Sequence, residues 1–355
     1  MDSFWQNKKV FITGHTGFKG SWLSLYLDLL GARVSGYALE PSTEPSLYRQ
    51  LQLDAVVDSV IGDIRDRHLV EDALVKSSPD IIFHLAAQPL VRDSYLHPIE
   101  TYETNVIGTA ILLNAARLVP SLSAIVIVTT DKCYFNYEQP EGYREEDRLG
   151  GFDPYSSSKA CTEILTDSFR NSFFDPAKYE DHGVAIATAR SGNVIGGGDW
   201  SDDRLIPDAM GAIGRQEILR VRYPDATRPW QHVLDPLRGY LMLAKALTLE
   251  GVKFGEAFNF GPARGESHSV ADVLDAFKNI WHDEFRWSAE AGEHLHEAGL
   301  LHLDCTKAAT GLSWQPLLDF QQTMDMTVQW YRDCQRQKDV IATTKEQIGT
   351  FLGNL

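Results

Sequence analysis

The 355-residue sequence predicts an α/β fold in which a doubly wound parallel sheet carries a smaller C-terminal lobe. Short runs of β-branched and aromatic residues alternate with helical segments from residue 9 to about residue 197. A glycine-rich turn joins the first strand to the first helix, as in dinucleotide-binding sheets. Beyond this point the alternation is lost. We therefore predict a Rossmann-type domain at 1–197, completed by 233–262, a lobe formed by 198–232 and 263–340, and a tail at 341–355.

The first strand, helix and turn lie at the start of the chain. Lys9–Thr13 (KVFIT) is predicted as a strand, and helical apolar spacing resumes in the segment SWLSLYLDLLG. Between them, GHTGFKG places glycines at Gly14, Gly17 and Gly20. Glycines let the backbone turn tightly and approach a pyrophosphate at the helix N-terminus. This context favours dinucleotide binding over a purely structural turn.

The second and third predicted strands are Arg33–Ala38 and Val57–Ile61. Many NAD-binding chains end the second strand with an acidic residue for the adenosine ribose. Here that position is Ala38, with Glu40 two residues on, and no arginine cluster for a 2′-phosphate replaces it. The strand therefore leaves NAD and NADP open. Asp63 follows the third strand and either caps the next helix or bonds the adenine edge.

The fourth predicted strand, Ile81–Leu85 (IIFHL), ends at two small residues, Ala86 and Ala87, which let a cofactor lie close. His84 within this strand is interpreted as a hydrogen-bonded structural histidine. Asn105–Val119 has the pattern of a long amphipathic helix.

A buried strand at Ile125–Val128 leads into Thr129-Thr130-Asp131-Lys132. Open parallel sheets bind their ligands at the carboxyl ends of the strands, so these polar residues are expected at the ligand-binding edge. The next predicted helix begins near FDPYSSSK and places Tyr155 and Lys159 four residues apart on one face. A lysine ammonium beside a phenol lowers the phenol pKa from about 10. Tyrosine then becomes a base for a sugar or alcohol hydroxyl.

The later part of the chain begins with the last strand of the alternating region, Val184–Arg190. A flexible loop, GGGDW, follows it. The elements predicted after this loop are helices at Leu205–Ile218 and Val233–Leu247, a strand at Ala257–Phe260, and helices at Val270–Ile280 and Phe320–Arg332. No element is predicted after Val340.

Composition narrows the range of partners. The net charge of −16 speaks against nucleic-acid or anionic-membrane binding, which both need a basic face. Within this acidic chain, a basic cluster at residues 220–232 is either surface charge or a site for phosphates and a base. The four cysteines form no CxxC pair or ligand-spaced cluster, so neither a metal nor a disulfide framework is indicated. With no long apolar run or cleavage pattern, we expect a soluble protein in the reducing cytoplasm.

At this point the motifs resemble a known family. GHTGFKG, HLAAQ, NVIGT, TTDKCY, YSSSK and RSGNVIGGGDW are together similar to the extended short-chain dehydrogenase/reductase superfamily. Within its sugar-nucleotide dehydratases and epimerases, the chain looks most like the CDP-glucose 4,6-dehydratases. The segments that indicate this are GGFDPYSSSKACTE, RNSFF, GNVIGGGDWSDDRLIPD and RPWQHVLDPLRGYL. The stretch FNYEQPE and the Ala160-Cys161 pair depart from the pattern of that group, in the region of the sugar pocket.

The resemblance implies an internal redox cycle on CDP-glucose, in which NAD⁺ oxidises C4, water leaves across C5–C6, and the stored hydride returns at C6. Tyr155 would take the 4-hydroxyl proton, Lys159 would hold the nicotinamide ribose, and Thr130 would bond the 4-oxygen. Asp131 would be the acid for the departing hydroxyl and Lys132 the base for C5–H. The residues themselves leave other interpretations open, since Asp131 also suits a turn cap and Lys132 an ion pair or a phosphate anchor.

The resemblance also implies binding residues. Those expected to contact NAD are Gly14, Gly17, Phe18, Lys19, Gly20, Asp63, Ile64, Leu85, Ala86, Ala87, Gln88, Asn105, Tyr155 and Lys159. Those expected to contact the sugar nucleotide are Arg92, Asn193, Arg204, Arg228, Trp230 and His232. The family further suggests a homodimer, or possibly a tetramer, and a product used for deoxysugars of polysaccharides such as lipopolysaccharide.

Three alternatives remain. A 4-epimerase of the same superfamily needs no elimination acid and base, so Asp131 and Lys132 argue against it. A dehydratase for dTDP- or GDP-sugars is disfavoured by Lys132 and the RPWQHV segment. A non-catalytic dinucleotide-sensing protein would be expected to lack Tyr155 or Lys159, and both are present.

Overall fold

The computed structural model describes residues 3–282, 285–290 and 299–353. Its centre is a seven-stranded sheet in the order β11-β6-β5-β4-β1-β2-β3, with every neighbouring pair parallel. This confirms the predicted fold class. The strands are β1 (Lys9–Thr13), β2 (Arg33–Ala38), β3 (Val57–Ile61), β4 (Ile81–His84), β5 (Ala124–Val128), β6 (Ala185–Ser191) and β11 (Ala257–Phe260).

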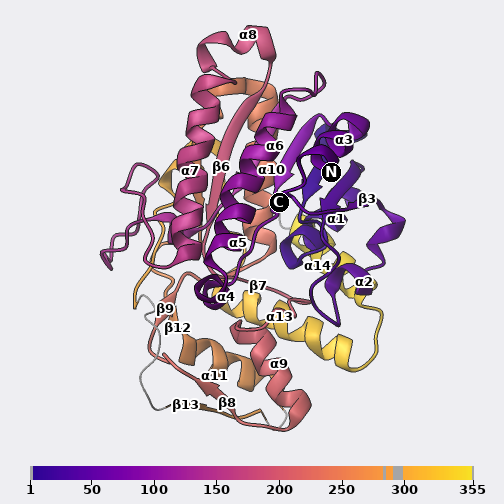
Figure 1. Cartoon of the computed structure of the whole chain (residues 1–355). Coiled ribbons are helices and arrows are strands. Elements are labelled where there is room, and N and C mark those ends of the chain that lie inside the picture. The colour runs from indigo at the N-terminus through magenta and orange to yellow at the C-terminus, as the bar shows by residue number, and fades with distance from the viewer. Residues whose placement is uncertain (1–2, 283–284, 291–298, 354–355) are drawn as a thin grey trace.

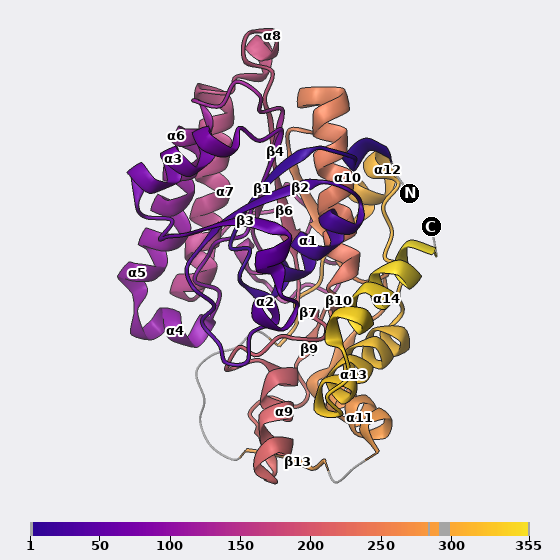
Figure 2. The same cartoon turned by 90° about the vertical axis from the view of Figure 1, so that its right-hand side faces the viewer.

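Helices cover both faces of this sheet (Figures 1 and 2). One face carries α1 (Phe18–Leu29) and α10 (Leu234–Glu250), and the other carries α3 (Arg67–Ser77), α6 (Gly108–Ala116) and α7 (Pro154–Ser172). Strand side chains alternate between the two resulting cores. In β5, for example, Val126 packs into the α10 core, whereas Ile125 and Ile127 pack into the α6 core. The strands are therefore buried on both faces, as expected for a parallel sheet.

The chain order in the sheet reverses between β1 and β4, because β2 and β3 lie on one side of β1 and the later strands on the other. Such a switch point opens a crevice at the carboxyl ends of the strands, where ligands bind. The loops that follow β1, β4, β5 and β6 all lead into this crevice.

The lobe lies beyond the same ends of the strands (Figure 2). It contains α9 (Leu205–Arg215), α11 (Val270–Trp281) and α13 (Phe320–Gln335). Its small two-stranded pairs are β7 (Val194–Ile195) with β10 (Gln231–His232), β8 (Leu219–Val221) with β13 (Trp287–Ala289), and β9 (Thr227–Arg228) with β12 (His268–Ser269). The remaining α-helices of the described residues are α2 (Leu47–Gln50), α4 (Val91–Leu96), α5 (Pro98–Tyr102), α8 (Tyr179–His182), α12 (Thr306–Leu312) and α14 (Val340–Gly353).

Three elements differ from the sequence-based expectation. The predicted helix at Asn105–Val119 is a π-helical turn, Glu103–Ile107, followed by α6, which ends at Ala116. The predicted helix from Leu205 ends early because Gln216 adopts a left-handed conformation. The tail forms α14, whose Phe351 is buried, because it packs on α13.

No helix in the described part of the chain is both long enough and apolar enough to span a membrane.

Candidate functional site

A single cavity of about 1450 Å³ runs from the glycine-rich turn after β1, past the ends of β4, β5 and β6, to the lobe. Pockets for one small ligand usually measure about 300–1,000 Å³, so this cavity has room for a dinucleotide and a second ligand side by side. The turn residues Gly14, Gly17, Phe18, Lys19 and Gly20 all line it.

The glycine-rich turn is packed too tightly for side chains at two positions. A Cβ on Gly14, which has a φ of 75°, would lie 2.8 Å from the backbone N of Ala86. A Cβ on Gly20 would lie 2.1 Å from the carbonyl oxygen of Gly14. The turn therefore lies directly on the end of β4, and the 12-residue helix α1 begins at the cavity with its N-terminal amides and positive dipole end.

The wall beside this turn comes from the loops after β3 and β4. Asp63 lines the cavity and pairs with Arg65 at 2.6 Å, and hydrogen bonds from Arg65 hold the pKa of that carboxyl below its usual range. The cap of α3 is Asp66, which accepts from two backbone amides, so Asp63 is free of the capping role. Ile64 after β3 also lines the cavity, and after β4 the lining residues are Leu85, Ala86, Ala87 and Gln88.

Asn105 differs from its predicted place in the cofactor site. It is buried and does not line the cavity. Its Oδ1 accepts from the backbone N of Gln88 at 2.8 Å, and its Nδ2 donates to Ser158 at 2.8 Å. The π-helical turn directs this side chain toward the side of the Gln88 loop that faces away from the cavity. Asn105 therefore supports the loop without lining the site.

His84 is hydrogen-bonded on both ring nitrogens, to Thr13 at 2.7 Å and to Thr109 at 2.9 Å. Burial lowers its pKa to about 3, so the ring is neutral. This agrees with the structural interpretation of His84.

The turn after β5 contains three of the predicted catalytic residues. Thr130 lines the cavity and its hydroxyl donates to Asp131 Oδ1 at 2.9 Å. Asp131 is fully buried just behind the lining, and its Oδ2 has no hydrogen-bond partner among the described residues. Lys132 lines the cavity, with its Nζ 3.6 Å from Asp131 Oδ1 and 3.5 Å from Asn193 Oδ1. The three side chains form one polar chain that ends at Asn193, a lining residue from the loop after β6.

Helix α7 presents Tyr155 and Lys159 to the cavity. It starts at Pro154, after Asp153, whose side chain caps the helix by accepting from the backbone N of Ser156 at 2.9 Å. The cap places Tyr155 in the first turn of the helix.

The pKa of Tyr155 differs from the expectation. Burial raises it to about 12, and a hydrogen bond with Thr130 and the charge of Arg204 oppose this only in part. Lys159 is not among the charges that lower it, and its Nζ donates to the carbonyl oxygen of Val128 at 3.2 Å. Burial also lowers the pKa of Lys159 to about 8.

The Lys19 side chain extends well beyond the glycine-rich turn that contains it. Its Nζ donates to Ser191 at 3.1 Å and to Tyr240 at 3.4 Å. Burial, followed by the positive charges of Arg204 and Lys159, lowers its pKa to about 7. The ammonium group therefore lies at the catalytic end of the cavity.

The far end of the cavity is lined by arginines from loops and from the lobe. Arg92 pairs with Asp203 at 2.5 Å and Arg204 with Asp199 at 2.9 Å. The other basic and aromatic lining residues of this end are Arg220, Arg222, Arg228 and Trp230. This arrangement can hold an anionic ligand such as a diphosphate.

His232 differs from its predicted contact with the sugar nucleotide. It is fully buried away from the cavity lining, and its ring packs against Trp22 at 5.9 Å. Its Nδ1 accepts from the backbone N of Leu234, and burial lowers its pKa to about 3. The extended segment is broken at Pro229, where the backbone N of Trp230 donates to the carbonyl oxygen of Arg228. Arg228 and Trp230 line the cavity, whereas His232 does not.

Sequence reasoning missed one buried pair beneath the floor of the cavity, Glu163 with Arg190 at 2.8 Å. Glu163 lies four residues after Lys159 in α7, so the helical period that linked Tyr155 with Lys159 was the signal that could have identified it.

Comparison with known proteins agrees with this geometry. The family model described as GDP-mannose 4,6 dehydratase matches residues 11–327. A CDP-glucose 4,6-dehydratase of Salmonella typhimurium is 48% identical over 99% of this chain and 98% of its own. A dTDP-glucose 4,6-dehydratase of Streptomyces antibioticus is 29% identical over 91% of this chain and 92% of its own.

Solved structures show the same fold at lower identity. A dTDP-glucose 4,6-dehydratase of Bacillus anthracis in complex with NAD has a TM-score of 0.75 at 21% identity, and it covers 94% of this chain and 99% of its own. A UDP-glucose 4-epimerase of Stenotrophomonas maltophila with bound NAD has a TM-score of 0.79 at 20% identity, covering 93% of this chain and 99% of its own. From the family model and the relative that is 48% identical, the chain belongs to the sugar-nucleotide 4,6-dehydratase family, in the group of the CDP-glucose 4,6-dehydratases.

Proposed function

We propose that the chain converts CDP-D-glucose to CDP-4-dehydro-6-deoxy-D-glucose with NAD as its cofactor. The observation that carries the proposal is the pair Asp131 and Lys132, 3.6 Å apart. Lys132 lines the cavity with Tyr155 and Lys159, and Asp131 is buried directly behind that lining. A tyrosine and a lysine alone serve the oxidation of an alcohol, whereas elimination of water needs an additional acid and base. Full-length similarity to a CDP-glucose 4,6-dehydratase supports the choice of nucleotide.

The residues of the cavity fit a dinucleotide. Gly14 and Gly20 form a turn that side chains would fill, the N-terminus of α1 faces a pyrophosphate position, and Ala86 and Ala87 leave room for rings beside β4. Asp63 is an acceptor for the adenosine end. Bound NAD supplies the oxidant for C4 and, at the end of the cycle, the reductant for C6.

For the first step, Tyr155 takes the proton of the 4-hydroxyl, assisted by Thr130. Burial works against the phenolate, because it raises the pKa of Tyr155 to about 12. A hydrogen bond with Thr130 and the positive charge of Arg204 work in favour of it. With a pKa of about 8, Lys159 is an ammonium ion at neutral pH and suits an anchoring role at the cofactor ribose.

For the second step, Lys132 takes the C5 proton and Asp131 gives a proton to the 6-oxygen, which leaves as water. In this step Lys132 acts as the amine and Asp131 as the carboxylic acid of a pair whose Nζ and Oδ1 lie 3.6 Å apart. After elimination, Lys132 carries the proton and Asp131 is a carboxylate, so one transfer back regenerates the starting form. The 4-ketone makes this possible, because it acidifies the C5 proton.

Sugar-nucleotide binding is assigned to the other end of the cavity. Asn193, Arg92, Arg204, Arg228 and Trp230 line it and suit a diphosphate and a base. In this division the cofactor belongs to 1–197 with 233–262, and the sugar nucleotide lies between the lobe formed by 198–232 and 263–340 and the Arg92 and Asn193 side chains of the first domain.

The test is a panel of sugar nucleotides incubated with protein and NAD, followed by mass spectrometry for loss of water. We expect loss of water from CDP-glucose, with an absorbing enone formed in alkali. Turnover of a dTDP-, GDP- or UDP-sugar without turnover of CDP-glucose would contradict the substrate assignment. Interconversion at C4 without loss of water would indicate an epimerase.

We also propose a homodimer. Exposed apolar side chains gather on the helices of one face, with Leu96 75% exposed, Ile99 66% and Ile164 60%. An apolar face of this kind suits a second copy of the same helices. Light scattering after size exclusion distinguishes monomer, dimer and tetramer, and Ile164→Lys should shift a dimer toward monomer. All four cysteines are free thiols, which is compatible with a reducing compartment such as the cytoplasm.

A further inference from the structure

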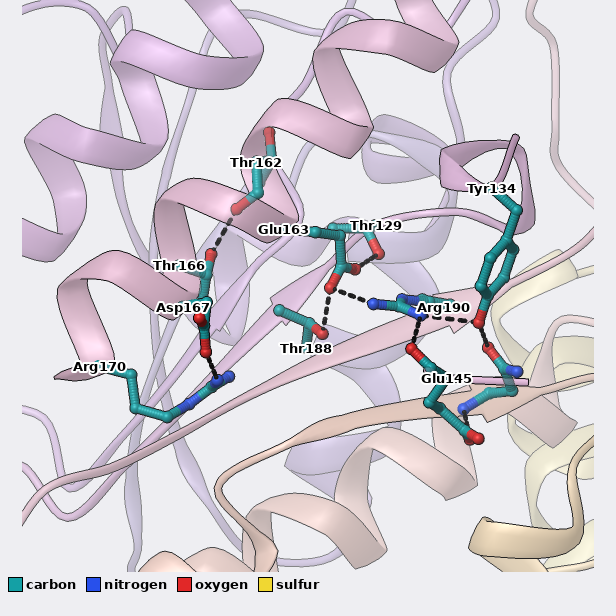
Figure 3. A network of polar contacts seen from close by, with 11 residues as sticks. Thr129, Tyr134, Glu145, Thr162, Glu163, Thr166, Asp167, Arg170, Thr188 and Arg190 are labelled. Atoms are coloured by element: carbon teal, nitrogen blue, oxygen red, sulfur yellow. Dashed lines mark hydrogen bonds and ion pairs between the residues drawn. The ribbon is translucent and has the colours of Figure 1, made fainter. Parts of the chain in front are cut away.

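Glu163 lies beneath the catalytic floor on the same face of α7 as Tyr155 and Lys159, eight and four residues after them. Its side chain is 4% exposed. The carboxylate accepts hydrogen bonds from Thr129, from Thr188 at 2.7 Å and from Arg190 at 2.8 Å (Figure 3). Thr129 follows β5, and Thr188 and Arg190 belong to β6. One buried carboxylate therefore joins α7 to two strands of the sheet.

This carboxylate and Lys159 hold consecutive residues of the chain. Lys159 donates to the carbonyl oxygen of Val128, and Glu163 accepts from the hydroxyl of Thr129. The next residue is Thr130, the start of the turn that carries Asp131 and Lys132. Helix α7 thus fixes the entrance of the catalytic turn at two successive positions.

Arg190, the ion-pair partner of Glu163, connects this arrangement to the cavity wall. Arg190 Nη1 donates to Tyr134 Oη at 2.7 Å and to the carbonyl oxygen of Glu145 at 3.0 Å (Figure 3). The Tyr134 hydroxyl in turn donates to Asn259 at 2.8 Å. Buried ion pairs are often replaceable by apolar side chains without loss of stability, so stability alone is a weak reason for this one.

The charges around Lys159 point to a second role. His84 on β4 is neutral, since burial lowers its pKa to about 3. Cys133 after β5 is a neutral thiol, because burial raises its pKa well above the usual range. Lys19 from α1 is a basic group whose pKa burial lowers to about 7, so it supplies no negative charge. Among the described groups whose charges act on Lys159, Glu163 supplies the negative charge at neutral pH, and it opposes the effect of burial.

We propose that Glu163 is a positioning residue for the reaction: paired with Arg190, its carboxylate keeps the buried Lys159 side chain as an ammonium ion and fixes the entrance of the Thr130–Lys132 turn. The catalytic part of this role rests on the proposed function, whereas the charge state of Lys159 does not. Glu163 acts through Lys159 and Thr129, because it does not line the cavity.

The test is a titration of the lysine side-chain ammonium groups by NMR in the intact protein, with the Lys159 signal assigned from Lys159→Met. In the wild type we expect Lys159 to titrate near pH 8. In Glu163→Gln we expect a midpoint lower by about one pH unit or more, since a neighbouring opposite charge typically contributes that much. The alkaline limb of kcat/KM with CDP-glucose should move to lower pH by the same amount.

Thr188→Val is the matched control, because it removes one hydrogen bond to Glu163 and leaves the charge. Its Lys159 midpoint should equal that of the wild type. If Glu163→Gln does not fold, as judged by circular dichroism, Glu163→Gln/Arg190→Met replaces the whole pair by neutral side chains of similar size. Its midpoint should still lie below the wild-type value.

Two results would overturn the proposal. One is a folded Glu163→Gln protein, or the folded double variant, in which Lys159 titrates as in the wild type. The other is a Thr188→Val protein whose midpoint moves as far as that of Glu163→Gln, which would assign the effect to packing. The NMR arm needs no turnover, so inactivity of the wild type toward CDP-glucose would sink the proposed function and leave this inference to be decided by the titration.

Discussion

The floor and the rim of the cavity differ in how exposed their ion pairs are to solvent. The floor comprises Thr130, Asp131, Lys132, Tyr155 and Lys159 with the buried pair Glu163 and Arg190. The rim comprises the cavity-lining arginines Arg92, Arg204, Arg220, Arg222 and Arg228 with the acidic partners Asp199 and Asp203. In the floor pair both side chains are 4% exposed, whereas in the rim pair Arg92 and Asp203 they are 51% and 35% exposed.

From this difference in exposure we expect the floor to serve the chemical steps and the rim to serve ligand binding. Exposed ion pairs contribute about 0–1 kcal/mol, so an exposed rim arginine such as Arg92 can exchange its carboxylate for a phosphate at little cost. The rim pair of Arg204 and Asp199 is more buried, with side chains 31% and 6% exposed. Removing one partner of a buried pair costs about 3–5 kcal/mol, so the floor keeps its arrangement whatever ligand is bound. Changes in the floor should therefore act on kcat, and changes in the rim on KM.

The largest effect is expected from Tyr155→Phe in the floor. Loss of the proton acceptor for the 4-hydroxyl should lower kcat by about 10⁴-fold, at the upper end for a single acid–base group. Binding of CDP-glucose, measured by calorimetry, should change by less than about twofold, because the phenyl ring keeps the shape of the site. Retention of more than a tenth of wild-type kcat would place the proton transfer elsewhere.

Lys132→Met should uncouple the two halves of the reaction. Without a base for the C5 proton, dehydration should fall by about 10²–10³-fold. Oxidation at C4 should persist and be visible as reduced cofactor absorbance under single-turnover conditions. In deuterated water the wild type should incorporate deuterium at C5, and the variant should not. Full dehydratase turnover by Lys132→Met would remove Lys132 as the base.

In the rim, Arg204→Met should raise KM for CDP-glucose by about 10- to 100-fold, the usual value of a hydrogen bond to a charged group. A smaller fall in kcat is expected, because the charge of Arg204 also opposes the burial effect on Tyr155. Arg215→Met is the control, since Arg215 pairs with Glu217 on the surface outside the cavity. A kcat effect larger than the KM effect would move Arg204 from the rim to the floor.

The floor and the rim also differ in how much of each could be predicted from the sequence. The floor depends on local patterns, because Tyr155 and Lys159 are one helical turn apart and Thr130 directly follows a buried strand. The rim pair of Arg92 and Asp203 depends on tertiary structure, since the two residues are 111 apart in the chain, whereas Arg204 lies only five residues after Asp199. His232 was assigned to the sugar nucleotide together with its segment, but the side chain is buried away from the cavity lining.

Other misses have the same origin. Asn105 was assigned to the cofactor from its motif, but the π-helical turn directs it to the back of the Gln88 loop. The pKa of Tyr155 was expected to follow Lys159, yet the depth of burial decides it, and burial is not visible in a spacing of four residues. Helix α14 was not predicted because only its packing on α13 distinguishes it from a tail.

The smallest effect on catalysis is expected from His232→Asn, which tests the boundary of the rim. Since the ring does not line the cavity, KM and kcat should stay within about twofold of wild type, while stability falls by about 1–3 kcal/mol, the usual range for a buried side chain.

The pH dependence of folding stability tests the same assignment of His232 more directly. His232 has a pKa of about 3 in the folded protein and 6.5 as its ordinary value, so between these values the unfolded chain binds a proton that the folded protein does not. Wild-type stability should therefore fall as pH decreases from about 7 to 4.5, and the variant should lose less over this range in thermal melts. An increase of KM by tenfold, with no change in that slope, would return His232 to the sugar-nucleotide site.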